Sequence, residues 1–170
     1  LKTKEIRDVV FLNLAYWLAL SGTQFTLLPL FMVAEPLSLD PGHLGIFFSS
    51  LSVVSVATAQ PAAWLADKYG KVPGLLAGTS LLSLSFATIP LATSFEGLML
   101  AGLPLALGGT VLSSVPTAHM SDLTTNEQRA QALALLRTAG DVGLLVGAMG
   151  SGLASEMMGI GNTMQFNAAL

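Results

Sequence analysis

The sequence of 170 residues contains no cysteine and few charged residues, and both deficits narrow its possible functions. Without cysteine there is no disulfide framework, no thiolate metal site and no cysteine nucleophile. Only 10% of the residues are charged, against about 25% in a typical soluble domain. With 7 basic residues against 10 acidic ones, the chain also lacks the basic footprint of a nucleic-acid-binding protein. A soluble domain and a nucleic-acid partner are therefore both disfavoured.

The apolar residues make up 52% of the chain and gather in long runs without charge. Four runs lie at residues 9–34, 44–66, 73–94 and 97–121. As helices rising 1.5 Å per residue, each is long enough to cross a hydrocarbon core of about 30 Å. A fifth run at 130–155 includes two charges, and a sixth begins at 163 and is cut short at 170. Backbone groups must be paired within lipid, and the alternation of barrel strands is missing, so we predict an all-α integral membrane protein.

The basic residues outside these runs fall on alternate connections. They are Lys2, Lys4 and Arg7 before the first run, Lys68 and Lys71 after the second, and Arg129 after the fourth. The other connections, at 35–43, 93–96 and 156–162, contain none. The positive-inside rule then places the N-terminal end and the loops near Lys68 and Arg129 in the cytoplasm or its equivalent.

The connection between the second and third runs carries the most specific motif. It reads Trp64-Leu65-Ala66-Asp67-Lys68-Tyr69-Gly70-Lys71. Gly70 allows a tight reversal of the chain, and Asp67 offers an acceptor to a helix N-terminus or to a basic partner. The motif resembles the loop signature of the major facilitator superfamily, G-x-L-A-D-[RK]-x-G-[RK]-[RK], with Ala63 and Val72 as departures from it.

Two later stretches support this resemblance. Residues 121–130, with Asp122, Glu127 and Arg129, are similar to the family's loop before its fifth or eleventh helix. The pattern Gly143-x-x-x-Gly147-Ala148-x-x-Ser151-Gly152 resembles the antiporter signature G-x-x-x-G-P-x-x-G-G, with alanine in place of proline and serine in place of a glycine.

The resemblance implies one six-helix half of a twelve-helix transporter, with its last helix truncated. The fourth run has Gly102 and Leu105 where the N-terminal half of drug antiporters carries Arg and Gln, so we expect the C-terminal half. The implied activity is secondary active transport of a small molecule by alternating access, with proton-coupled efflux in an antiporter-like branch as its specific form. An uptake carrier for a sugar or metabolite and a channel-like or non-transporting membrane protein remain the alternatives.

The same resemblance implies which partners and which membrane to expect. The partners are the small-molecule substrate, protons, the lipid bilayer and the other half of the transporter. Neither a cofactor nor a metal is expected, and without H-E-x-x-H, paired carboxylates or a phosphate-binding loop the sequence does not point to an enzyme. The plasma membrane is the default location, and an organellar membrane fits equally well.

Charged and polar residues inside the runs are candidates for transport, because such residues are costly in lipid. Arg137 and Asp141 share one face of the fifth predicted helix and could bind a polar substrate group or couple protons; the alternative is a structural ion pair. Along the first helix, Asn13, Trp17, Ser21 and Gln24 form a stripe that indicates substrate contact or inter-helix hydrogen bonding. Gln60 in the second helix is a similar candidate.

Two further groups have roles implied by the family. The cytoplasmic loop motifs supply a charge group that could act as a gate, the alternative being an ordinary solvated loop: Asp67, Lys68, Gly70, Lys71, Asp122, Glu127 and Arg129. Gly143, Gly147 and Ser151, followed by Gly152, leave room for a second helix to approach closely. In the family, this helix contact is a pivot between the two halves.

Overall fold

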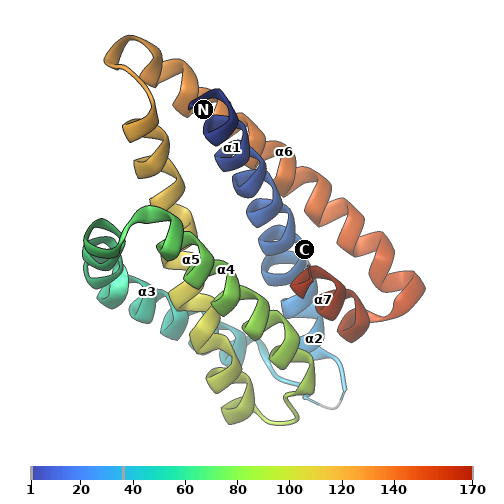
Figure 1. The fold of residues 1–170 in the computed structure, drawn as a ribbon. Helices are drawn as coiled ribbons and strands as arrows, with labels where there is room; N and C mark the ends of the chain where they lie inside the picture. Colours follow the sequence, from blue (N-terminus) through green and yellow to red (C-terminus); the bar gives the residue numbers. More distant parts are fainter. Residues whose placement is uncertain (1, 36, 170) are drawn as a thin grey trace.

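The computed structural model describes residues 2–35 and 37–169, and helices make up most of them (Figure 1). The elements in chain order are α1 (Lys2–Leu20), the π-helical turn η1 (Ser21–Leu27), α2 (Leu28–Val33), α3 (Pro41–Tyr69), α4 (Lys71–Thr88), the 3₁₀ turn η2 (Ile89–Leu91), α5 (Phe95–Leu123), α6 (Asn126–Met158) and α7 (Ile160–Ala168). These described residues contain no strand, which confirms the predicted all-α class.

Long apolar helices dominate the structure. Within the described ranges, five helical segments are long and apolar enough to span a membrane: Lys4–Val33, Pro41–Tyr69, Lys71–Leu91, Phe95–Leu123 and Asn126–Met158. Most of these helices extend beyond the runs that mark them in the sequence, because a helix continues past the hydrocarbon into polar ends; the third span instead ends at Leu91, before the end of its run at 94. The α7 helix begins at Ile160 rather than at 163, directly after Gly159, whose φ of 84° ends α6.

The first span departs from the single helix expected over residues 9–34. Its hydrogen bonding widens to a π turn at Ser21–Leu27 before α2 begins. Pro29 contributes to the irregularity, because it has no N–H to donate to the carbonyl of Phe25. The N–H of Leu28 instead donates to the carbonyl of Thr23, five residues back.

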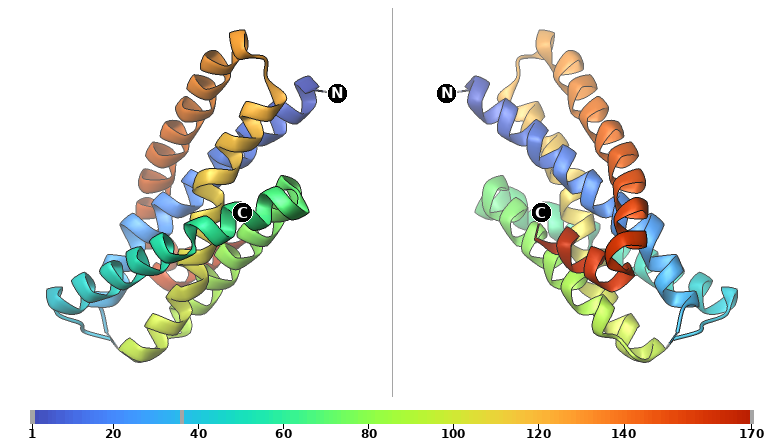
Figure 2. Two further views of the ribbon diagram at one scale, coloured as in Figure 1. Left: turned by 90° about the vertical axis from the view of Figure 1, so that its left-hand side faces the viewer. Right: turned by 90° about the vertical axis from the view of Figure 1, so that its right-hand side faces the viewer.

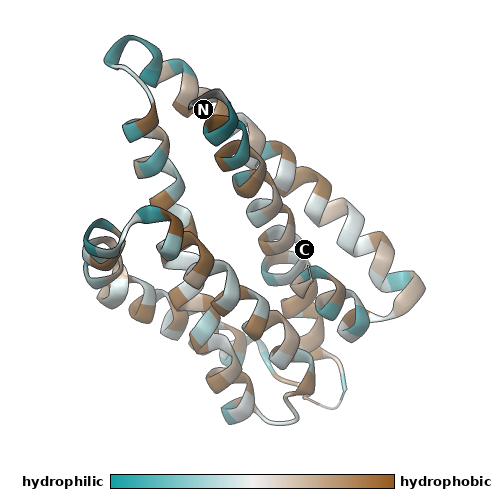
Figure 3. Cartoon of the chain, viewed as in Figure 1, coloured by the Kyte–Doolittle hydropathy of each residue, from teal (hydrophilic) through white to brown (hydrophobic). Residues whose placement is uncertain are grey.

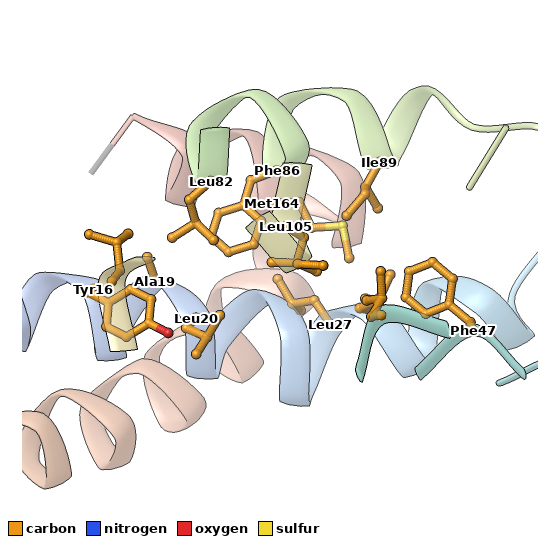
Figure 4. Close-up of a cluster of buried hydrophobic side chains, with 14 of the residues drawn as sticks. Tyr16, Ala19, Leu20, Leu27, Phe47, Leu82, Phe86, Ile89, Leu105 and Met164 are labelled. Carbon is orange, nitrogen blue, oxygen red and sulfur yellow. The ribbon is translucent and has the colours of Figure 1, made fainter. Parts of the chain in front are cut away.

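The helices are arranged around α5. Figures 1 and 2 show α1 and α6 side by side on one flank of α5, with α3 and α4 on the other flank. The short α7 lies against α4, α6 and η1. The main core forms where these elements converge, and Leu27, Phe47 and Met164 are fully buried in it (Figure 4).

Hydrophobic residues are spread along all the long helices (Figure 3), and many of their side chains are exposed on the outside of the bundle. Large exposed examples include Val53 and Val56 on α3 and Leu145, Met149 and Leu153 on α6. Soluble monomers rarely expose apolar patches of this extent, whereas a surface in contact with lipid hydrocarbon does. The exterior therefore has the character of a membrane-embedded bundle.

The start of α3 depends on a charged cap. A carboxylate oxygen of Asp40 accepts hydrogen bonds from the backbone N–H of His43 at 2.9 Å and from its Nδ1 at 2.9 Å. These bonds hold the pKa of Asp40 below its ordinary value. We expect Asp40→Ala to speed amide hydrogen exchange at His43 severalfold at neutral pH. Because the pKa of Asp40 is lowered in the folded state, the cap is stabilising at pH values above the ordinary pKa of about 3.9. The exchange rates of wild type and variant at His43 should therefore converge only as the pH falls below that value.

The neutral cap of α5 provides the control for this prediction. Oγ of Ser94 accepts a hydrogen bond from the N–H of Gly97 at 3.1 Å, so the effect of Ser94→Ala on exchange at Gly97 should not depend on pH. Exchange is compared at each pH after correction for the intrinsic rate. A difference between wild type and Asp40→Ala that persists unchanged at the lowest pH would contradict the charged-cap account.

Candidate functional site

Two adjoining cavities open on one face of the bundle. One, of about 530 Å³, lies between α1, α5 and α6, and the other, of about 610 Å³, lies between α1, η1, α3 and α5. Trp17 and Ser113 line both, so the two cavities adjoin at these side chains, and together they are called the hollow. We call them the α6 cavity and the α3 cavity.

The linings of the two cavities differ in chemistry. The α6 cavity contains both charges of the fifth span, Arg137 and Asp141, together with the polar side chains of Asn13 and Thr117. Among the residues that the structure describes, the α3 cavity has no charged lining residue. Its lining mixes aromatic and aliphatic side chains, such as Phe25, Phe48, Leu51, Val56 and Leu105, with hydrogen-bonding ones: Tyr16, Trp17, Gln24, Ser52, Ser55, Thr110 and Ser113. The two cavities together therefore offer a charged end and an uncharged end to anything that occupies both.

The predicted pair on α6 lies together, as its spacing indicated. Arg137 and Asp141 are both exposed, and neither takes part in an ion pair within residues 2–35 and 37–169. The alternative of a structural ion pair between them is therefore not what this conformation contains. Both charges are available to a ligand in the α6 cavity.

The polar stripe on the first span divides between two roles. Nδ2 of Asn13 donates to the carbonyl of Leu136 at 2.8 Å, and Oγ of Ser21 donates to the carbonyl of Leu144 at 2.6 Å. These two side chains thus bond α1 and η1 to α6, although Asn13 also borders the α6 cavity. Trp17 and Gln24 line the cavities instead. Gln60 is exposed on α3 and lies outside both cavities.

A seam of small residues sets the distance between α1 and α6. A methyl group on Gly143 would lie 3.1 Å from the backbone nitrogen of Leu18, and one on Gly147 would lie 2.8 Å from the carbonyl carbon of the same residue. Ser151 is buried at the end of this seam. Gly152 has no heavy atom within 4 Å of the corresponding position, so it does not contribute to this contact.

Sequence reasoning missed most of the α3 cavity lining and also three residues nearer α6. Gly140 continues the seam, because a methyl group there would lie 2.8 Å from the Trp17 ring. Ser113 and Thr117 line the α6 cavity from α5. Their four-residue spacing within an uncharged run is a signal that could have found them, and Gly140 is seven residues before Gly147 on the same helix.

In the described part of the chain, the two loop motifs meet at one ion pair. Nζ of Lys71, at the start of α4, pairs with a carboxylate oxygen of Asp122, near the end of α5. Nη2 of Arg129 donates weakly to the carbonyl of Ser121 at 3.4 Å. Gly70 has a φ of 101°, which is the left-handed reversal expected between α3 and α4.

The other members of this loop group lie apart from that pair. Nζ of Lys68 lies 4.6 Å from the centre of the Trp64 ring. Asp67 and Glu127 are exposed, and neither forms an ion pair among the residues that the structure describes. Of the charge group predicted from the loops, this conformation thus forms the ion pair between α4 and α5.

Comparison with known proteins agrees with this architecture. The sequence profile described as Major Facilitator Superfamily matches residues 10–170. The chain belongs to the major facilitator superfamily. Membership makes it a multi-pass membrane protein of a family of small-molecule transporters, surrounded by lipid.

Two curated relatives of this major facilitator chain match parts of it. It is 36% identical over 85 residues to "Multidrug resistance protein MdtH" of Photorhabdus laumondii, a match that covers 50% of this chain and 21% of the relative. It is 21% identical over 127 residues to "Uncharacterized MFS-type transporter MJ1560" of Methanocaldococcus jannaschii, covering 74% of this chain and 32% of the relative. The matched part of the chain thus spans between a fifth and a third of the length of these relatives.

Proposed function

We propose that the chain is the C-terminal six-helix half of a secondary active transporter, and that its hollow is one wall of the transport pathway. One observation carries this proposal: two charged side chains that have no ion-pair partner among residues 2–35 and 37–169 line an open cavity of an otherwise apolar bundle. Charges at this depth are too costly to face lipid and must face protein or water. A second half packed over the hollow would enclose a water-filled pathway between the two, and alternating access would follow from rocking of the halves.

The proposed cargo is a drug-like molecule exported in exchange for protons. The α3 cavity supplies aromatic and aliphatic surface for an apolar body, and the α6 cavity supplies Arg137 and Asp141 for a polar group. The similarity to a multidrug resistance protein supports efflux over uptake of a sugar.

Counterflow in proteoliposomes tests this function. The full-length protein should exchange labelled for unlabelled drug-like substrate with saturation, which a channel does not do. The two tryptophans of this chain provide a matched pair of variants, since Trp17 lines both cavities of the hollow and Trp64 lies at the end of α3 outside it. Trp17→Ala should raise KM about tenfold, the loss of one buried aromatic contact, while Trp64→Ala should leave KM unchanged. Conductance without saturation, or equal effects of the two variants, would contradict the proposal.

We further propose that the Lys71–Asp122 pair acts as a latch at the cytoplasmic end. It joins the start of α4 to the end of α5, and α5 carries Ser113 and Thr117 into the hollow. Lys71→Asp places like charges together and should increase labelling of a Thr117→Cys probe from the cytoplasmic side about threefold, as expected for loss of a single surface ion pair.

The same turn contains the control for the latch. Lys68→Asp changes charge by the same amount, but Lys68 contacts the Trp64 ring rather than a carboxylate, so it should leave labelling at position 117 unchanged. The double variant Lys71→Asp/Asp122→Lys should restore the wild-type rate. Failure of the reversed pair to restore the rate would show that the ion pair is not the cause.

A further inference from the structure

Three buried polar side chains from distant parts of the chain meet beside the π turn. Nδ2 of Asn167, on α7, donates to Oγ1 of Thr23 at 3.0 Å and to Oγ of Ser151 at 3.0 Å. Asn167, Thr23 and Ser151 are 4%, 0% and 5% exposed. Because polar groups buried without partners are costly, these contacts fix the position of η1 against α6 and α7.

The backbone of η1 does not determine this geometry alone. Short π turns are rare and occur where something other than regular helix bonding holds them. Pro29 removes the donor that would bond to the carbonyl of Phe25 in an α-helix, so the α form of this segment also lacks a hydrogen bond. Gly22 packs directly against Ser151 and would have no room for a side chain. The side-chain contacts with α6 and α7 therefore select between the two helical forms.

The choice of form decides what the α3 cavity contains. Gln24 and Phe25 directly follow Thr23 and line that cavity. A π turn contains one residue more than an α-helical turn. Conversion into α-helix would therefore rotate the side chains on one side of the turn by about 100° relative to those on the other side. Gln24 and Phe25 would then no longer present the same surface to the cavity.

We infer that Asn167 is a positioning residue for the binding cavity: through Thr23 it holds the π turn that places Gln24 and Phe25 in the wall. This inference rests on the proposed function for the meaning of the cavity, but the contact between Asn167 and Thr23 is independent of it. Asn167 itself does not line the α3 cavity, so it acts through η1 rather than by touching a substrate there.

The test measures the accessibility of a single cysteine at position 24. This chain has no native cysteine, so Gln24→Cys can be made in a full-length protein freed of any others. The rate of labelling by a water-soluble thiol reagent is measured without substrate or gradient. Thr23→Val keeps the shape and removes the hydroxyl acceptor, and Asn167→Ala removes the donor. Thr23→Val should change the rate roughly fivefold, the population shift given by one hydrogen bond of ordinary strength, and Asn167→Ala, which also removes the bond to Ser151, should change it at least as much.

Matched variants separate positioning from general loosening. Thr23→Ser keeps a hydroxyl and should restore the wild-type rate. Asn162→Ala lies on the same helix, but Asn162 is exposed and bonds to the carbonyl of Met158 at 2.8 Å, so it should have no effect. A Thr117→Cys probe on α5, which lines the α6 cavity but not the α3 cavity, should label at the same rate in all variants. The inference is overturned if position 24 labels equally in every variant, or if positions 24 and 117 change together.

Two more measurements complete the test. In wild type, the amides of residues 24–28 should exchange with solvent as slowly as those of residues 9–20. If they exchange as fast as the amides of the loop at 37–40, the inference is overturned, even if the variants fail to fold. In transport, Asn167→Ala should raise KM with kcat retained, as expected for a displaced cavity wall. Absence of all transport in wild type would defeat the proposed function, whereas the labelling result would still decide the role of Asn167.

Discussion

Gly147→Ala is expected to separate α1 from α6 and to lower the stability of the folded protein. The added methyl group would collide with the carbonyl group of Leu18, lying 2.8 Å from its carbon. The obstacle is backbone, so no side-chain rotation can relieve it and the helices must move apart. Overpacking of a well-packed core lowers the free energy of unfolding by about 1–3 kcal/mol. A collision with backbone should lower it by an amount at or above the upper end of this range. The melting temperature of the purified protein in detergent measures the loss.

Gly150 on the same helix supplies the matched control. No heavy atom lies within 4 Å of a methyl group placed there, so Gly150→Ala adds the same atoms without a collision. It should leave the protein as stable as wild type or stabilise it by up to about 1 kcal/mol, because alanine favours helix over glycine. Equal losses from the two variants would show that α6 does not approach α1 as closely as the seam requires.

The seam also shows how far the sequence predicts packing. Gly143, Gly147 and Ser151 recur at helical spacing, and this periodicity alone indicates a close helix contact. The sequence does not say which helix fills the space, because that depends on how the spans pack in three dimensions. The structure shows the partner to be α1. Gly152 fits the same motif but points away from the contact, since neighbouring residues on a helix face different directions.

The site was predictable in its chemistry and less so in its geometry. Uncharged runs locate the spans, and residues such as Asp141 stand out within them because charge is rare there. The π turn could not be read from hydrophobicity, because Ser21–Leu27 is as uncharged as its surroundings and Pro29 is tolerated in membrane helices for several reasons. The Lys71–Asp122 pair joins loops 51 residues apart, and only the tertiary arrangement selects it from the other charges of the loop group.

Asparagine at position 141 is expected to abolish transport driven by a proton gradient. The substitution keeps the size of the side chain and removes its charge and its capacity to carry a proton. Asp141 borders the α6 cavity without an ion-pair partner in the described part of the chain, so its loss leaves no buried cation unpaired there. We expect gradient-driven accumulation of the substrate to fall at least tenfold, with the amount and melting temperature of the protein unchanged. Both are measured on the full-length protein, the first in proteoliposomes.

Counterflow decides which role Asp141 has, because exchange of substrate for substrate needs no net proton movement. If Asp141 carries the proton, Asp141→Asn should keep counterflow while losing accumulation; if it binds the substrate, both should fall and KM should rise. Arg137→Gln, on the same face, should raise KM in either case because it removes a charge from the same cavity. Glu156→Gln is the control, since Glu156 is exposed near the end of α6 and outside both cavities. Unchanged accumulation in Asp141→Asn would exclude this carboxylate from the transport mechanism and leave its position in the hollow without a functional explanation.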